Sequence, residues 1–104
     1  MKDLSQQEWS DAVSSNAEAV IVDVRTPEEV EGGYIPNAIH IDIQQGPGFL
    51  DEVQKLDAAK PTYVYCRSGA RSTQACQLMD QLGFDETYNL QGGILAWQGD
   101  LKTD

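Results

Sequence analysis

The chain has 104 residues and a formal net charge of −10, and 40% of its residues are hydrophobic. This length predicts one domain, residues 1–104, with a folded core from about residue 4 to 97. The acidity argues against nucleic acid and anionic membranes as partners, because both attract positive patches. No apolar run approaches the roughly 18 residues of a transmembrane helix, and the N-terminus lacks the apolar segment of a signal peptide. We expect a cytoplasmic protein, with a monomer as the default for this size.

The first part of the chain predicts a helix, a buried strand and a second, short helix. A capping box at residues 5–8 opens a helix that runs to about residue 13. The near-continuous apolar run 19–24 is typical of a strand covered on both faces, as in parallel sheets. Thr26 as N-cap and Pro27 at the first helical position then open a helix that a Gly-Gly pair ends.

The middle of the chain predicts a turn, a short strand and a third helix before the next strand. Residues 34–37 have the composition of a turn, and 38–41 that of a short strand. After a glycine-rich loop, the apolar residues of 49–56 recur at helical spacing. Pro61 separates this helix from the β-branched and aromatic strand 62–65.

The segment Cys66–Arg71, with sequence CRSGAR, is the most informative part of the chain. A cysteine between a strand and a helix lies where backbone N–H groups and the helix dipole converge. That position and the neighbouring Arg67 and Arg71 favour the thiolate, which is the nucleophilic form of cysteine. The chain has only one other arginine, Arg25, and guanidinium groups suit oxyanions. The sequence therefore predicts an anion-binding loop with Cys66 as its nucleophile.

The last third of the chain predicts a helix, a strand and a short helix. The helix that follows the cysteine loop is amphipathic and ends at Gly83 as its C-terminal cap. Residues 86–90 form the last strand, 94–97 a short helix, and the polar tail 98–104 is expected to fray.

Strands thus alternate with helices along the whole chain, which predicts an α/β domain with a mainly parallel sheet. Right-handed crossovers would place helices on both faces of this sheet. In open sheets of this kind the ligand site lies at the carboxyl ends of the strands, where Cys66 is expected.

Four stretches of the chain match one family in order and in spacing: Ile21–Glu29, Gly33–Ile41, Cys66–Ser72 and Leu90–Trp97. Together they resemble the single-domain rhodaneses, which are sulfurtransferases, over about residues 4–97. The resemblance implies a rhodanese-like three-layer domain with helices on both faces of the sheet. The second stretch departs from the pattern, since Tyr34 replaces the family's usual His and Asn37 its usual Gly. Neither change puts the activity in doubt, because position 34 is generally structural and Asn tolerates the left-handed conformation.

The resemblance also implies a reaction. Cys66 would take a sulfane sulfur from thiosulfate or another persulfide donor and pass it to a thiophilic acceptor. The acceptor would be cyanide or a thiol, with thioredoxin and glutathione as candidates, and neither a metal nor an organic cofactor is implied. Backbone N–H groups of the loop would stabilise the anionic sulfur, and the two arginines would bind the donor. The substrate-binding residues would be Arg67, Ser68, Gly69, Ala70 and Arg71.

Two other functions stay open at this point. Phosphatase or arsenate-reductase chemistry uses a Cys-x5-Arg loop in relatives, whereas this chain has Cys-x4-Arg, a tighter ring that suits a single sulfur atom. A non-catalytic module that carries or senses sulfur would form the persulfide but turn over only with a partner protein. Sulfur transfer is the interpretation that the loop favours.

The other polar residues are interpreted as structural. Asp23 and Arg25 lie at the end of a predicted strand, and the resemblance implies that they support the fold and neighbouring loops; His40 lies in an apolar strand. Cys76 falls within the amphipathic helix as a small core residue, with resolution of an oxidised Cys66 as the alternative. One histidine and two cysteines give no zinc-site spacing and no disulfide scaffold.

Overall fold

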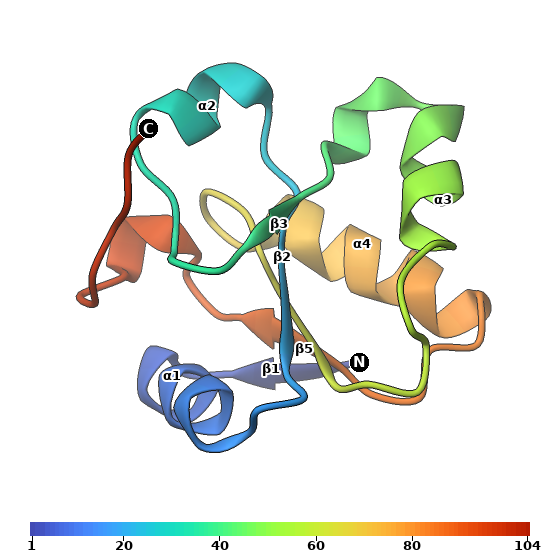
Figure 1. Cartoon of the computed structure of the whole chain (residues 1–104), viewed down its shortest axis with the longest axis horizontal. Helices are drawn as coiled ribbons and strands as arrows, with labels where there is room; N and C mark the ends of the chain where they lie inside the picture. The colour runs from blue at the N-terminus through green and yellow to red at the C-terminus, as the bar shows by residue number, and fades with distance from the viewer.

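The computed structural model describes residues 1–104 and is built on a five-stranded sheet of order β1-β5-β4-β2-β3 (Figure 1). Every neighbouring pair of strands is parallel, which confirms the predicted α/β class. The β2 and β4 strands lie inside the sheet, and this explains their almost unbroken apolar and aromatic composition. The strands are β1 (Lys2–Leu4), β2 (Val20–Asp23), β3 (Ile39–His40), β4 (Thr62–Tyr65) and β5 (Thr87–Leu90).

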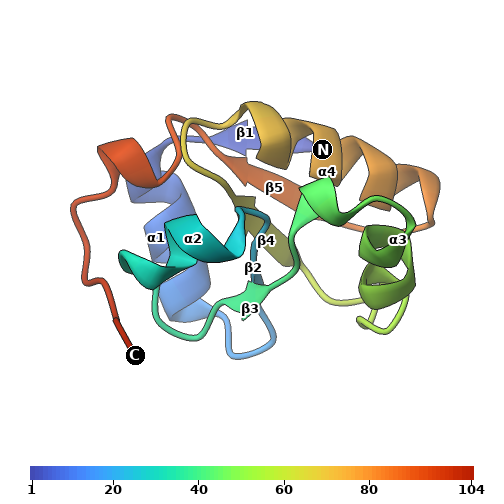
Figure 2. The ribbon, with the colours of Figure 1, turned by 90° about the horizontal axis from the view of Figure 1, so that it is seen from above.

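Helices cover both faces of the sheet, as predicted (Figure 2). One face carries α1 with the 3₁₀ turn η2, and its core includes Trp9, Tyr63 and Leu90. The other face carries α3 and α4, and its core includes Val64 and Met79. The helical elements are α1 (Gln6–Ser15), α2 (Pro27–Glu31), η1 (Ile43–Gln45), α3 (Pro47–Val53), α4 (Ala70–Gln81) and η2 (Ile94–Ala96). None of the helices combines the length and apolar character needed to cross a membrane.

The predicted capping box at residues 5–8 and the predicted N-cap at Thr26 are both formed. The Ser5 hydroxyl accepts from the Glu8 backbone at 3.2 Å, while the Glu8 carboxylate accepts from the Ser5 backbone at 3.0 Å. Thr26 and Glu29 repeat the arrangement at the start of α2. The α1 helix extends to Ser15, two residues beyond the predicted end. The exposed Asn37 adopts the left-handed conformation that asparagine tolerates, with a φ of 71°.

Two secondary-structure elements differ from the expectation, an unpredicted edge strand and the third helix. Residues 2–4 form an edge strand that was not predicted, and they pair with residues 88–90 of β5. Only Leu4 of these three residues is buried, so the sequence carries little strand signal there. The third helix lies at 47–53 instead of 49–56, because Pro47 occupies its first turn and the chain leaves the helix after Val53.

The tail was expected to fray, and this was wrong. The backbone N–H of Tyr34 donates to the carbonyl of Lys102 at 2.9 Å, and the Lys102 N–H donates back at 2.8 Å. The Tyr34 hydroxyl also donates to the Asp104 carboxylate at 2.8 Å. Residue 34, where the family usually has His, therefore anchors the end of the chain to the segment before β3.

Candidate active site

The cysteine loop joins the carboxyl end of β4 to the start of α4 and lies beside η2 (Figure 2). Cys66 follows the last residue of β4, and Gly69 is the N-cap of α4. Gly69 has a φ of 110°, which L residues with a side chain rarely adopt. This turn aims the Gly69 N–H at the Cys66 sulfur, with a distance of 3.0 Å between nitrogen and Sγ.

Hydrogen-bond donors surround the Cys66 sulfur, and only 1% of the residue is exposed. The hydroxyl of the fully buried Ser72 lies 3.3 Å from Sγ. Burial alone would raise the pKa of this thiol, but hydrogen bonds from Ser72 and from the Gly69 and Ser68 backbone outweigh it. The net effect lowers the pKa of Cys66 below its usual value, which increases the thiolate fraction near neutral pH.

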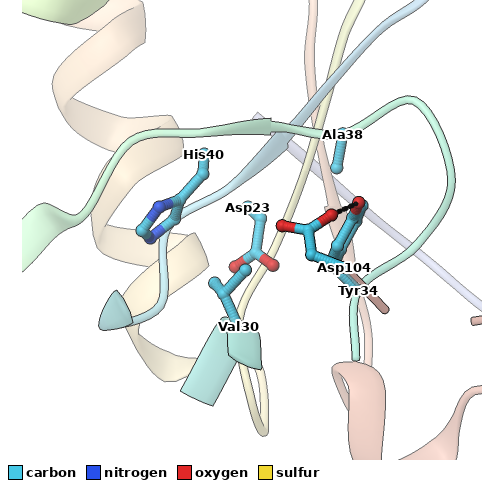
Figure 3. Close-up of a pocket in the computed structure, with 6 residues that line it drawn as sticks. All are labelled: Asp23, Val30, Tyr34, Ala38, His40 and Asp104. Atoms are coloured by element: carbon cyan, nitrogen blue, oxygen red, sulfur yellow. Dashed lines mark hydrogen bonds between the residues drawn. The ribbon is translucent and has the colours of Figure 1, made fainter. Parts of the chain in front are cut away.

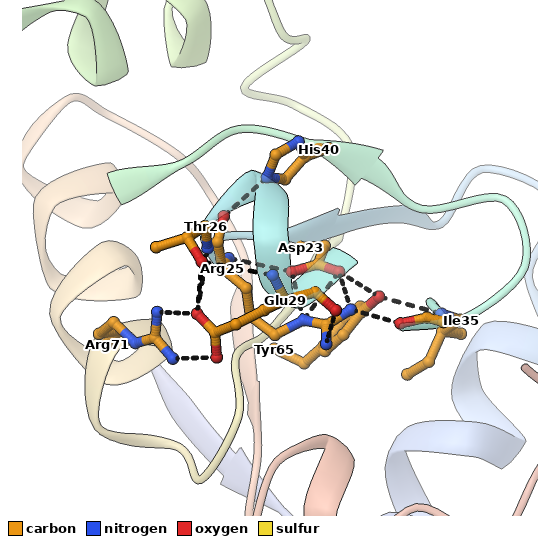
Figure 4. A network of polar contacts seen from close by, with 9 residues as sticks. Asp23, Arg25, Thr26, Glu29, Ile35, His40, Tyr65 and Arg71 are labelled. Atoms are coloured by element: carbon orange, nitrogen blue, oxygen red, sulfur yellow. Dashed lines mark hydrogen bonds and ion pairs between the residues drawn. The ribbon is translucent and has the colours of Figure 1, made fainter. Parts of the chain in front are cut away.

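The two arginines of the loop differ in what they contact. Arg67 is exposed, and its side chain makes no hydrogen bond or ion pair within the protein. Arg71 donates from both terminal nitrogens to the Glu29 carboxylate, at 2.7 and 2.8 Å (Figure 4). This pairing lowers the pKa of Glu29 to about 2. Of the two predicted donor-binding side chains, only Arg67 thus has all its N–H groups free.

Residues 93–95, which belong to the matched stretch Leu90–Trp97, pack against the cysteine loop and brace it by hydrogen bonds. The N–H groups of Ile94 and Leu95 donate to the carbonyls of Cys66 and Arg67, at 3.0 and 3.1 Å. Gly93, with a φ of 61°, lies so close that an added Cβ would be 2.3 Å from the Arg67 carbonyl oxygen. Only glycine fits at this position, because neither backbone can move away without breaking the two hydrogen bonds.

A sealed polar cluster lies near the loop, at the end of β2 (Figure 4). Arg25 donates to both carboxylate oxygens of the buried Asp23 and to the carbonyls of Glu29 and Gly33. The Tyr65 hydroxyl donates to the same carboxylate at 2.7 Å. These contacts bind the β2 strand to α2 and to the turn that follows it, which is the structural role predicted for Asp23 and Arg25. The imidazole of His40 contacts the Arg25 carbonyl at 2.6 Å, so it too supports this turn.

Sequence reasoning missed three residues around the loop: Glu29, which pairs with Arg71, and Ser72 and Asn89, whose side chains contact each other next to the Cys66 sulfur. Glu29 was assigned no role in the site, although it follows the end of a neighbouring strand and carries the charge that pairs with an arginine of the loop. Ser72 lies in the quoted loop motif, one residue beyond the predicted ligands, and Asn89 is in an ordinary strand pattern. The other cysteine, Cys76, is fully buried, and burial raises its pKa to about 12, so it is a poor nucleophile.

No cavity opens at the cysteine loop. The cavity drawn in Figure 3 has a volume of about 260 Å³ and lies between α2, β3 and the tail. The other cavities are also lined by residues outside 66–71. None of the cavities therefore encloses the buried Cys66 sulfur, while Arg67 and Ser68 beside it are exposed. The lining residues of the cavity in Figure 3 are Asp23, Val30, Tyr34, Ala38, His40 and Asp104.

Comparison with known proteins gives concordant matches. The model of the rhodanese-like domain family matches residues 5–100. The chain is 36% identical over 102 residues to YtwF, a putative sulfurtransferase of Bacillus subtilis, covering 98% of this chain and 95% of that protein. It is 35% identical over 97 residues to a sulfurtransferase of Allochromatium vinosum, covering 93% and 88%. The crystal structure of a rhodanese-like domain protein from Staphylococcus aureus superposes with a TM-score of 0.85 at 32% identity, covering 100% and 99%.

Proposed function

The chain belongs to the family of rhodanese-like domains, and from this membership we propose that it is a sulfurtransferase that carries sulfane sulfur as a persulfide on Cys66. The observation that carries the proposal is the set of donors directed at one sulfur atom. The Gly69 N–H and the Ser72 hydroxyl contact Sγ at the start of α4, and together they favour the thiolate.

The reaction would proceed in two steps. The Cys66 thiolate attacks the outer sulfur of thiosulfate, the S–S bond of the donor breaks, and sulfite leaves with the bonding electron pair. Cyanide or a thiolate then attacks the terminal sulfur of the persulfide, which restores the Cys66 thiolate and releases thiocyanate or a new persulfide. No proton has to be removed in either step if the thiolate is already present, so the site needs no general base.

Positive charge beside Cys66 would hold the anionic sulfur donor. Arg67 offers an uncommitted guanidinium beside Cys66, and the loop N–H groups offer an anion site at the start of α4. Arg71 contributes positive charge near the sulfur while Glu29 fixes its position. Thiosulfate fits these features because it is small and doubly negative.

The lack of a cavity at the cysteine loop favours one second candidate, a sulfur carrier that works only with a partner protein. Because no cavity encloses a small donor, a partner could supply the missing walls. Such a module would accept one sulfur on Cys66 and release it only to that partner.

Thiocyanate production from thiosulfate and cyanide would test the proposal on the wild type, Cys66→Ser and Cys76→Ala. We expect activity in the wild type and in Cys76→Ala, and none in Cys66→Ser. Turnover by Cys66→Ser would contradict the role of Cys66. If the wild type is inactive but gains the mass of one sulfur on Cys66, the carrier function is correct instead. Hydrolysis of a phosphate ester by the wild type would point to the phosphatase alternative.

A further inference from the structure

A chain of polar side chains leads from Cys66 across the sheet to its edge. The Ser72 hydroxyl, next to the sulfur, also contacts the side-chain oxygen of Asn89 in β5. The side-chain nitrogen of Asn89 donates to the carboxylate of Asp3 in β1, at 2.9 Å. Ser72 and Asn89 are buried, while Asp3 is exposed. Of these four residues, the proposed reaction requires only Cys66 and Ser72, so the role of Asn89 and Asp3 is open.

The Ser72 hydroxyl has more acceptors around it than it has protons. Its oxygen lies 3.1 Å from the Gly69 carbonyl, 3.3 Å from the Cys66 sulfur, and within hydrogen-bond distance of the Asn89 oxygen. One hydroxyl donates one proton, so a bond to Asn89 is a bond withheld from the sulfur. A thiolate at Cys66 gains from the Ser72 proton, whereas a thiol does not need it.

Asp3 determines which atom of the Asn89 amide faces Ser72. A carboxylate only accepts hydrogen bonds, so the amide nitrogen must point to Asp3 and the amide oxygen to Ser72. If the amide turned around, its N–H would donate to the Ser72 oxygen and leave the hydroxyl proton for the sulfur. The side chain of Asp3 therefore holds Asn89 in the orientation that competes with Cys66.

We propose that Asp3 and Asn89 are positioning residues for Cys66, which draw the Ser72 proton away from the sulfur and so raise the fraction of Cys66 in the thiol form. This inference takes Cys66 as the reactive thiol of the proposed function, but it concerns the ionisation of Cys66 and not the reaction. Removal of Asp3 frees the amide to turn, and the thiolate becomes easier to form.

Other charges also act on Cys66 and have to be separated from this effect. Arg71 of α4 interacts with the thiolate and is itself paired with Glu29 of α2 and close to Asp42, which precedes η1. Arg67 belongs to the loop. Because Asp3 is negative, its removal would lower the pKa of Cys66 by charge alone, without any part played by Ser72. The test must therefore distinguish an effect of Asp3 that depends on the Ser72 hydroxyl from the direct effect of the Asp3 charge on Cys66.

The pH dependence of Cys66 alkylation by iodoacetamide, followed by peptide mass spectrometry, reports this ionisation without any sulfur donor. We expect Asp3→Ala to shift the midpoint of the alkylation profile down by about half to one pH unit, the size of one ordinary hydrogen bond. Ser72→Ala should shift it up. Asp51→Ala, which removes an exposed carboxylate of α3, serves as the control for net charge and should leave the midpoint in place.

The decisive variant is Asp3→Ala combined with Ser72→Ala. If Asp3 acts through the hydroxyl, removing Asp3 shifts the midpoint much less once Ser72 is gone, because only its charge then acts on Cys66. An undiminished shift in the double variant would show that charge alone acts and would overturn the proposal, as would an unchanged or raised midpoint in Asp3→Ala itself. Because the profile is measured without sulfur transfer, an inactive wild type would count against the proposed function and leave this result standing.

Discussion

Two polar regions lie at the carboxyl ends of the strands and differ in how many of their hydrogen-bonding groups have partners within the protein. In the cluster of Asp23, Arg25 and Tyr65, the carboxylate, the guanidinium and the phenol all have partners within the protein. At the cysteine loop, Arg67 has no partner and the Ser72 proton has three competing acceptors. Both regions contain buried polar groups at the carboxyl end of a parallel strand. Position alone therefore does not distinguish a structural polar cluster from a reactive site, whereas hydrogen-bonding groups without a partner do.

The largest effect on stability is expected when a partner is removed from the cluster of Asp23, Arg25 and Tyr65. Asp23→Ala leaves the Arg25 guanidinium buried without its charge partner, and such a loss costs about 3–5 kcal/mol in the free energy of unfolding. Urea denaturation would measure it, with Asp51→Ala as the exposed control. A loss below about 1 kcal/mol would show that the cluster is not the support that its contacts indicate.

The next largest effect tests the brace of the loop. Gly93→Ala forces a Cβ against the Arg67 carbonyl, and overpacking of this kind costs about 1–3 kcal/mol and displaces the loop. We expect kcat to fall as well. Gly46→Ala is a matched control, since Gly46 also has a positive φ but its Cβ would meet nothing within 4 Å. If the two variants behave alike, backbone strain and not the contact with the loop explains the effect.

Removal of the free arginine should affect binding and leave the fold intact. Arg67→Ala removes charge-assisted hydrogen bonds to the donor, and we expect the KM for thiosulfate to rise by about ten-fold with little change in unfolding free energy. Lys55→Ala removes a surface charge elsewhere and should change neither quantity. Arg71→Ala should raise KM too, but with a loss of stability, because it releases Glu29. An unchanged KM in Arg67→Ala would exclude that residue as a donor ligand.

The smallest effect concerns the pair of Glu29 and Arg71. The pKa of Glu29 falls from 4.5 to about 2 on folding, so its contribution to stability is complete above pH 4.5 and is lost as the pH falls toward 2. Unfolding free energies of the wild type and Glu29→Gln should differ by about 1 kcal/mol or less at pH 6 and converge near pH 2. A difference that stays constant over this range would rule out the ion pair as its source.

The sequence predicts best what is local. The loop from Cys66 to Arg71, the two capping boxes and the left-handed Asn37 all depend on residues within a few positions of each other, and the structure forms these local geometries as expected. The inner strands β2 and β4 were equally predictable, because a strand buried on both faces has a continuous apolar run.

Contacts between distant segments could not be predicted in this way. Glu29 and Arg71 are 42 residues apart, and nothing in either neighbourhood identifies the other as its partner. The β1 strand has three residues and one buried side chain, so its pairing depends on the β5 surface it meets. The chain from Ser72 to Asp3 crosses three elements, and only the register of the sheet brings them together.

The position of β5 between β1 and β4 has a consequence for the order in which this protein can fold during synthesis. The first strand made is an edge strand, and its only partner in the sheet is residues 88–90, near the end of the chain. The brace at Gly93 and Leu95 is made later still. A nascent chain released N-terminus first therefore holds β1 unpaired until β5 has left the ribosome, and such long-range pairing is slow to form. The nucleophilic loop therefore lacks the two hydrogen bonds from Ile94 and Leu95 that support it until the residues after β5 have also been made.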